Sequence, residues 1–184
     1  MVDARRVLFI DLTAGTTRTE EVDASGTLGL GGKVLGLRLL EQYLDPEVGP
    51  LAPENVVVLT PSRLVAYSMS GSDRFGAFTK SPLTGVWLES YCGGSFARTL
   101  CETGWEAVVI SGSAPTPIRL HVDAEGAQLL LASGLWGRDT FAVEAEILAK
   151  LDKRSAVLSI GVAGEKLVSV ACVMHQQAHT LGRG

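Results

Sequence analysis

A weak internal repeat is the feature that most constrains how this 184-residue chain can fold. Each copy contains an apolar run, an alternating run and a glycine loop, at residues 56–59, 75–78 and 91–94 in the first copy and at residues 157–160, 167–170 and 182–184 in the second. In the first copy a helix and a strand follow the glycine loop, whereas the second copy reaches only its loop. The repeat therefore predicts a duplicated unit that is truncated in its second half, where a helix and a strand are missing.

The other segments predict a mixed α+β fold. Strands occur in blocks with helices between the blocks, and no linker-like stretch divides the chain, so we expect residues 1–184 to form one domain. The further predicted elements are a hairpin of residues 7–12 and 17–22, a helix over residues 28–44, strands over residues 107–111 and 118–122, a short helix between Gly94 and Thr103, and a helix that Asp139 caps and that runs to Leu151.

The composition argues for a soluble globular protein, with 46% hydrophobic residues, 20% charged residues and a formal net charge of -4. A negative chain has no general attraction for a phosphate backbone or an anionic membrane surface, so we expect neither nucleic acid nor membrane as a partner. No apolar stretch reaches the ~18 residues of a membrane span, and the N-terminus lacks a signal-peptide pattern. We therefore expect a cytoplasmic protein.

The three cysteines are Cys92, Cys101 and Cys172, which are far apart and form no C-x-x-C pair. An odd number of isolated cysteines suits a reducing compartment better than a disulfide framework. Three thiols are also too few for the usual four-thiolate iron-sulfur site. Any such cluster must be ligated outside this chain.

Two segments could hold an anionic ligand. The glycine-rich run Gly29–Val34 fails both the dinucleotide and the phosphate-loop spacings, so we interpret it as the start of a helix. Arg74 stands beside Gly71 and Gly76, where a guanidinium could offer a rigid fork of donors to a phosphate or a pterin edge. A salt bridge of Arg74 to Asp73, or a solvated position, remains an equal alternative.

The glycine loops of the repeat are the other candidates. Gly93 and Gly94 would let the backbone approach a ligand closely at the start of a helix. Beside them, Cys92 is better interpreted as a small buried residue than as a reactive thiol, because no basic residue adjoins it in sequence. His175 and His179 have H-x-x-x-H spacing, but their segment follows a strand, so we do not favour a metal site there.

Taken together, the segments resemble the N-terminal domain of the aldehyde ferredoxin oxidoreductase family along essentially the whole chain. Each matching segment is weak alone, and their joint order is specific. The segments are Gly31-Gly32-Lys33, residues 51–55, Arg74 with residues 79–85, Gly93-Gly94, residues 135–140, residues 159–165 and Gly182-Arg183-Gly184.

The resemblance implies a two-sheet domain with pseudo-twofold symmetry that cradles a tungsten, or molybdenum, bis-pterin cofactor. It also implies oxidation of aldehydes to carboxylates, with electrons passing through a 4Fe-4S cluster to ferredoxin or a related electron-transfer protein. The cluster ligands and acid-base residues of the family belong to later domains, so the remaining domains of the parent enzyme are expected partners and no catalytic residue is assigned here. The resemblance is also compatible with a homo-oligomer.

The resemblance assigns roles to eight residues. Arg74 matches a pterin-contacting arginine, and the backbone carbonyls of Tyr91 and Thr180 match the ligands of a magnesium ion that bridges the pterin phosphates. The cofactor-binding residues implied are Arg74, Tyr91, Gly93 and Gly94 around the first loop, and His179, Thr180, Gly182 and Arg183 around the second.

The chain departs from the family at its loops. Tyr91 replaces a common asparagine, His179 replaces a permanently charged arginine, and residues 175–177 replace an Asn-Asp-Gly stretch. Related enzymes with other carbonyl or thioester substrates therefore stay open. The alternative function is a non-catalytic truncated paralogue that acts as a binding or partner-stabilising module. In either case we expect the isolated chain to be inactive.

Overall fold

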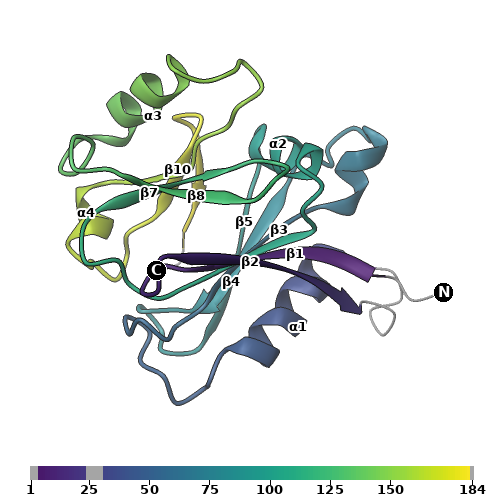
Figure 1. Cartoon of the computed structure of the whole chain (residues 1–184), viewed down its shortest axis with the longest axis horizontal. Coiled ribbons are helices and arrows are strands. Elements are labelled where there is room, and N and C mark those ends of the chain that lie inside the picture. Colours follow the sequence, from purple (N-terminus) through teal and green to yellow (C-terminus); the bar gives the residue numbers. More distant parts are fainter. Residues whose placement is uncertain (1–3, 24–30, 183–184) are drawn as a thin grey trace.

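The first half of the protein builds one sheet. A computed structural model describes residues 4–23 and 31–182. The elements of the first half are β1 (Ala4–Asp11), β2 (Thr16–Asp23), α1 (Lys33–Tyr43), β3 (Val57–Pro61), the 3-10 helix η2 (Arg63–Tyr67), β4 (Phe75–Lys80), β5 (Trp87–Cys92), α2 (Phe96–Glu102) and β6 (Ala107–Ser111). The six strands follow the order β2-β1-β6-β3-β4-β5 (Figure 1). β6 pairs in parallel with β1 and antiparallel with β3, so it joins the N-terminal hairpin to the rest of the sheet.

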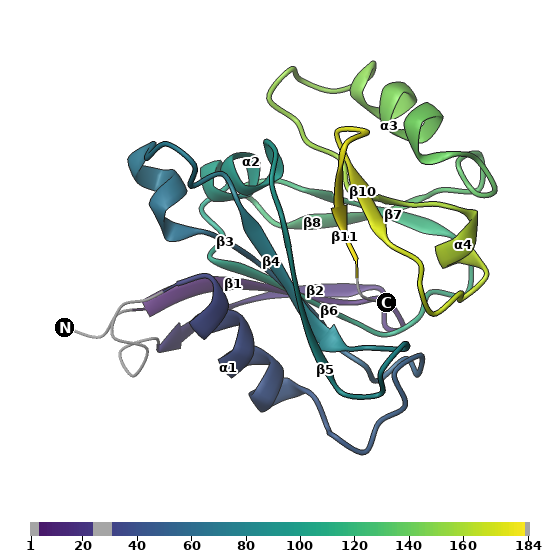
Figure 2. The same ribbon diagram turned by 180° about the vertical axis from the view of Figure 1, so that it is seen from behind.

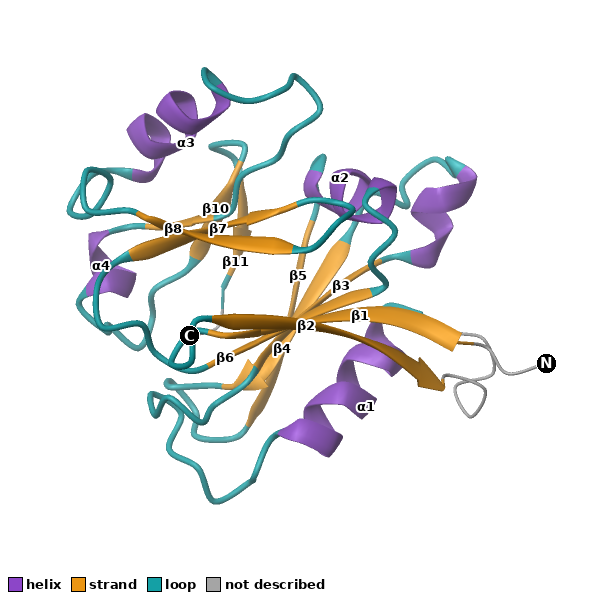
Figure 3. Cartoon of the chain, viewed as in Figure 1, coloured by secondary structure: helices purple, strands orange, loops and turns teal. Residues whose placement is uncertain are grey.

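The second half forms two smaller sheets. Its elements are β7 (Ile118–Val122), β8 (Ala127–Leu131), α3 (Thr140–Leu148), β9 (Ser159–Ile160), α4 (Val162–Glu165), β10 (Val173–His175) and β11 (His179–Leu181). β7 and β8 form a separate hairpin, and the other strands form a three-stranded sheet in the order β11-β10-β9. Figure 3 shows β7, β8, β10 and β11 gathered on one side of the six-stranded sheet. The mixed α+β class expected from the sequence is confirmed.

The two halves repeat the same order of elements. The hairpin β1–β2, then α1, β3, η2, β4 and β5, corresponds in sequence order to the hairpin β7–β8, then α3, β9, α4, β10 and β11. Within residues 4–23 and 31–182, β6 has no counterpart in the second half. In the first half β6 joins the hairpin to its sheet, whereas in the second half β7–β8 and β9–β11 belong to separate sheets.

The structure corrects several predicted boundaries. Helix α1 begins at Lys33, and residues 28–30 of the predicted helix lie outside the described residues. Strands β5 and β8 were not predicted. The alternating run 167–170 is not a strand, because the chain turns there with Leu167 at a φ of 57° and no partner strand beside it. β10 and β11, further along the chain, take the places that correspond to β4 and β5.

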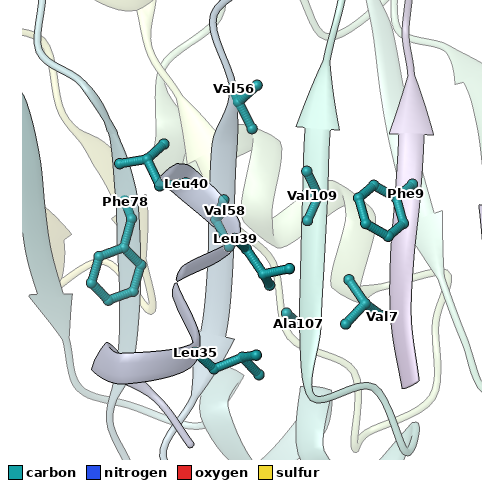
Figure 4. Packing of buried hydrophobic residues seen from close by; sticks show 10 residues of the cluster. All are labelled: Val7, Phe9, Leu35, Leu39, Leu40, Val56, Val58, Phe78, Ala107 and Val109. Atoms are coloured by element: carbon teal, nitrogen blue, oxygen red, sulfur yellow. The ribbon is translucent and has the colours of Figure 1, made fainter. Parts of the chain in front are cut away.

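The two faces of the six-stranded sheet pack against different helices. On one face Leu35, Leu39 and Leu40 of α1 are buried against residues of β1, β3, β4 and β6 (Figure 4). Gly36 permits this close contact, since a Cβ there would lie 2.3 Å from Cε2 of Phe78. On the other face, Leu100 of α2 packs with residues of β1 and β6. Within the described ranges, no helix is long and apolar enough to cross a bilayer.

A third cluster of buried residues joins the two halves. Phe75 and Ala77 of β4, Cys92 of β5 and Ala97 of α2 pack together with Leu181 of β11. Since Cys92 precedes the first glycine loop and Leu181 precedes Gly182, the cluster holds these two points of the chain near each other.

Candidate cofactor site

Strand pairing brings Arg74 to the first glycine loop. β4 and β5 are antiparallel, and Phe75 at the start of β4 pairs with Cys92 at the end of β5. Arg74, just before β4, and Gly93, just after β5, therefore lie at the same end of the sheet. The structure thus brings these two predicted site residues together from positions 19 apart in the chain.

A cavity of about 490 Å³ opens at this end of the sheet. Its lining includes three basic residues, Lys33, Arg63 and Arg74, together with Tyr91. The Arg74 side chain is exposed and has no hydrogen-bond or ion-pair partner among the described residues, because Asp73 pairs instead with Arg98 at 2.9 Å. The alternative of an Arg74–Asp73 salt bridge is therefore wrong. Three cationic groups around one cavity suit an anionic ligand.

Lys33 and Arg63 were missed as site residues. Lys33 begins α1, as the interpretation of the glycine-rich run required, and its ammonium also forms an ion pair with Glu89 at 2.8 Å. Arg63 begins η2, and its stem lies against Gly31, where a Cβ would be 2.3 Å from Cγ of Arg63. Neither residue stands in a recognised phosphate-binding spacing, so only the packing of α1 and η2 reveals the pair.

Glu89 connects two residues on the wall of the cavity. The Tyr91 hydroxyl donates a hydrogen bond to Glu89 at 2.9 Å, and the other Glu89 oxygen accepts from Lys33 at 2.9 Å. Burial, together with the hydrogen bond to the Glu89 carboxylate, raises the pKa of Tyr91 to about 12. Tyr91 is therefore a neutral hydrogen-bonding group at physiological pH.

The segment that leads into the second glycine loop lies beside the first loop. β11 packs beside β5 (Figure 2), and the backbone N–H of Gly182 donates to the Ser90 hydroxyl at 3.1 Å. His179 lies close to Gly93, since a Cβ on that glycine would be 3.5 Å from Nδ1 of His179. Thr180 is exposed and pairs with Met174 across β10 and β11. Arg183 and Gly184 lie outside the described residues.

His175 is a buried structural residue. Its side chain is 1% exposed, and its Nδ1 lies 2.8 Å from the Val157 carbonyl oxygen, which can only accept. The proton therefore sits on Nδ1, and Nε2 accepts a hydrogen bond from the Phe96 backbone N–H at 3.2 Å. Since both ring nitrogens are occupied, His175 is not free to bind a metal with His179. Groups of three or more potential metal-ligating side chains are absent from residues 4–23 and 31–182.

Cys92 has the environment of an unreactive thiol. It is 2% exposed within the cluster that joins the two halves. Burial raises the pKa of the thiol, although the Arg74 charge acts in the opposite direction. The interpretation of Cys92 as a small buried residue is confirmed, because the thiolate is the reactive form.

These features define a class of protein: an α+β domain with two halves of similar element order, a cationic cavity beside the first glycine loop, and β11 packed against β5. Residues 7–184 match the family described as aldehyde ferredoxin oxidoreductase, N-terminal domain. The chain belongs to the aldehyde ferredoxin oxidoreductase family.

Individual relatives agree with this assignment. The tungsten-containing aldehyde ferredoxin oxidoreductases of Pyrococcus furiosus and Thermococcus kodakarensis are each 33% identical to this chain, over 97% of it and 30% of their own length. A solved structure of the active-site complex BamBC of benzoyl coenzyme A reductase, in complex with 1,5-dienoyl-CoA, matches with a TM-score of 0.92 and 29% identity. That match covers 97% of this chain and 28% of the other. The chain thus spans about 30% of the length of these relatives.

Proposed function

We propose that this chain is the cofactor-facing N-terminal domain of an oxidoreductase that holds tungsten, or molybdenum, in a bis-pterin cofactor. The observation that carries the proposal is the cationic cavity lined by Arg74 and Tyr91 beside the first glycine loop, in a member of a family with tungsten-containing oxidoreductases. The bound cofactor would supply the redox centre. The work of this domain is to bind and orient it.

The residues around the cavity fit such a ligand. Arg74 and Arg63 offer planar donors suited to phosphate oxygens or the polar edge of a pterin, and Lys33 adds a positive charge. The exposed Arg74 guanidinium needs no existing contact to break before it binds. Around the loops, Gly93, Gly94, His179, Thr180, Gly182 and Arg183 remain the proposed cofactor-binding residues.

A magnesium ion between the pterin phosphates belongs to the same proposal, with the backbone carbonyls of Tyr91 and Thr180 as its ligands. Carbonyl oxygen is a donor that Mg²⁺ accepts, and a backbone ligand tolerates a change of side chain. Tyr91 can therefore replace the asparagine common in the family without removing the ligand.

The proposed reaction is oxidation of an aldehyde to a carboxylate. Electrons would pass through a 4Fe-4S cluster, ligated outside this chain, to ferredoxin or a related protein. Aldehydes are favoured because the relatives with 31 to 33% identity are named tungsten-containing aldehyde ferredoxin oxidoreductases, whereas the benzoyl coenzyme A reductase complex is 29% identical and a relative named aliphatic sulfonate oxidoreductase is 24% identical.

We also propose that a helix and a strand outside residues 1–184 complete the second half. The strand would take the place that β6 has in the first half, between β7 and β9. Residues of β7 and β9 line one cavity of about 590 Å³ together with β6 and α2, and its walls include Val108, Ile110, Leu120, Val122 and Ile160. An apolar space of this size beside unpaired strand edges suits an additional amphipathic helix.

The test is the metal and pterin content of protein purified from its native host. We expect tungsten or molybdenum with pterin in the wild type, and about tenfold or greater loss of pterin in Arg74→Ala, because a charge-assisted hydrogen bond contributes roughly 1.5 to 3 kcal/mol. Arg154→Ala is the control, since the Arg154 side chain is 83% exposed and forms an ion pair with Asp152 in its own loop. Metal-free and pterin-free wild-type protein with its partners intact would instead support the binding module.

A further inference from the structure

The start of α2 lacks a local cap. An α-helix leaves its first backbone N–H groups without partners in the helix, and a side chain at the preceding residue usually accepts from one of them. Ser95 precedes α2 in a helical conformation, with φ of -74° and ψ of -17°, and its side chain makes no capping hydrogen bond. The amides at the start of α2 therefore need partners from elsewhere.

Those partners come from the second half of the chain. The N–H of Ser95 donates to Oε1 of Gln176 at 3.2 Å, and the N–H of Phe96 donates to Nε2 of His175 at 3.2 Å. The side-chain amide Nε2 of Gln176 donates in return to the Ser95 hydroxyl at 3.0 Å. We refer to these three contacts as the inter-loop hydrogen bonds, because they connect the two residues after Gly94 to His175 and Gln176 at the β10–β11 turn.

The turn is itself held in place on its far side. Nδ1 of His175 donates to the Val157 carbonyl, and the N–H of Gln176 donates to Glu144 at 2.8 Å. Glu144 is only 5% exposed. The inter-loop hydrogen bonds therefore continue into α3 and the segment before β9.

The backbone accepts strain to reach this arrangement. Gln176 and Gln177 have φ values of 49° and 55°, a left-handed conformation that costs roughly 1 to 2 kcal/mol for a residue with a Cβ. Gly94, with φ of 92°, approaches the turn so closely that a Cβ would lie 2.7 Å from Cδ2 of His175. Backbone strain of this kind persists where the surrounding contacts stabilise it, and it is found most often at functional sites.

We propose that His175 and Gln176 are positioning residues that connect the β10–β11 turn, which leads into the second cofactor loop, to the start of α2 beside the first loop, and that protonation of His175 breaks this connection. The positive charge would place an N–H on Nε2, opposite the Phe96 N–H, so a hydrogen bond becomes a repulsion. The role of the two loops in cofactor binding rests on the proposed function. The connection and its pH dependence do not.

The surroundings of His175 determine the pH range. Burial lowers the pKa of His175 below its ordinary value, the Val157 carbonyl and the Glu144 carboxylate act against this, and His179 acts with it. Since the folded-state pKa lies below the unfolded one, the neutral form stabilises the fold above the unfolded pKa of about 6.5. This stability is lost as the pH falls through the folded-state pKa.

Two variants separate the roles of the two ring nitrogens of His175. His175→Gln can place an acceptor near the position of Nε2 but does not titrate, whereas His175→Asn can keep a donor towards Val157 but removes the acceptor for Phe96. Hydrogen exchange of the Phe96 amide in the full chain, followed by NMR from pH 8 to pH 5 and corrected for intrinsic rates, reports the contact directly. This readout needs no cofactor, so its outcome is separate from that of the metal and pterin measurement.

We expect protection of the Phe96 amide to fall about tenfold in His175→Asn at pH 8, to fall in the wild type as the pH is lowered, and to stay constant with pH in His175→Gln. His179 is present in every variant, so a pH dependence that persists in His175→Gln would assign the effect elsewhere and overturn the pH role of His175. Wild-type protection that does not change from pH 8 to pH 5 would overturn the same role. If His175→Asn does not fold, wild type and His175→Gln still decide the question.

Discussion

Gly94→Ala tests whether the close approach of the two loops stabilises the domain. The new Cβ would lie 2.6 Å from Oε1 of Gln176 and 2.8 Å from Nε2 of His175. The glutamine amide is the end of a flexible side chain and can move, but His175 is fully buried and held at Val157. The substitution should therefore break the contact between His175 and Phe96.

The magnitude has two parts. A φ of 92° costs an alanine roughly 1 to 2 kcal/mol, and a buried hydrogen-bonding group left without its partner costs about 1 to 3 kcal/mol. The expected loss in the free energy of unfolding is therefore about 2 to 5 kcal/mol. Gly15→Ala is the matched control, since its φ is 67° and no atom lies within 4 Å of the new Cβ, so only the backbone cost of roughly 1 to 2 kcal/mol applies.

Urea unfolding of the two variants and the wild type measures the difference. With a denaturant dependence of about 2 kcal/mol per molar, an additional 2 kcal/mol in Gly94→Ala would lower the midpoint by about 1 M relative to Gly15→Ala. Equal midpoints for the two variants would refute the reasoning, because they would show that the space around Gly94 adds nothing to its backbone conformation.

Two further predictions concern local backbone groups. Asp139→Ala should lower the free energy of unfolding by about 1 kcal/mol, because the carboxylate accepts from the Ala142 N–H at 2.9 Å at the start of α3. Asp139→Ser should retain most of this stability, since serine also caps helices. A urea midpoint unchanged in the alanine variant would contradict the capping role. Gln177→Gly should raise the thermal midpoint measured by calorimetry, because glycine adopts the left-handed φ of 55° at this exposed position without the cost of a Cβ, which stabilises the fold by about 1 kcal/mol. A lower midpoint would show instead that the Gln177 side chain stabilises the turn.

Much of the fold follows from local signals in the sequence. The hairpin of β1 and β2, the strands β6 and β7, and the Asp139 cap of α3 depend on alternation, turn residues and a capping side chain that act within a few residues. The alternating run at residues 167–170 shows the limit of such signals. Alternation suits a strand, but a strand also needs a neighbour with free backbone groups, and within residues 4–23 and 31–182 no strand pairs with that segment.

The candidate site also depends partly on local sequence and partly on tertiary packing. The sequence by itself identified Arg74 and the two glycine loops as candidates, because a charge and the conformational freedom of glycine are properties of the residue type. It also showed the family resemblance that the comparisons confirmed. Only the tertiary structure decided that Lys33 and Arg63 share a cavity with Arg74, and that His175 and Gln176 satisfy the amides of a helix about 80 positions earlier. Those contacts depend on how distant elements pack, and hydrogen-bond partners so far apart leave no periodic or spaced pattern in a single sequence.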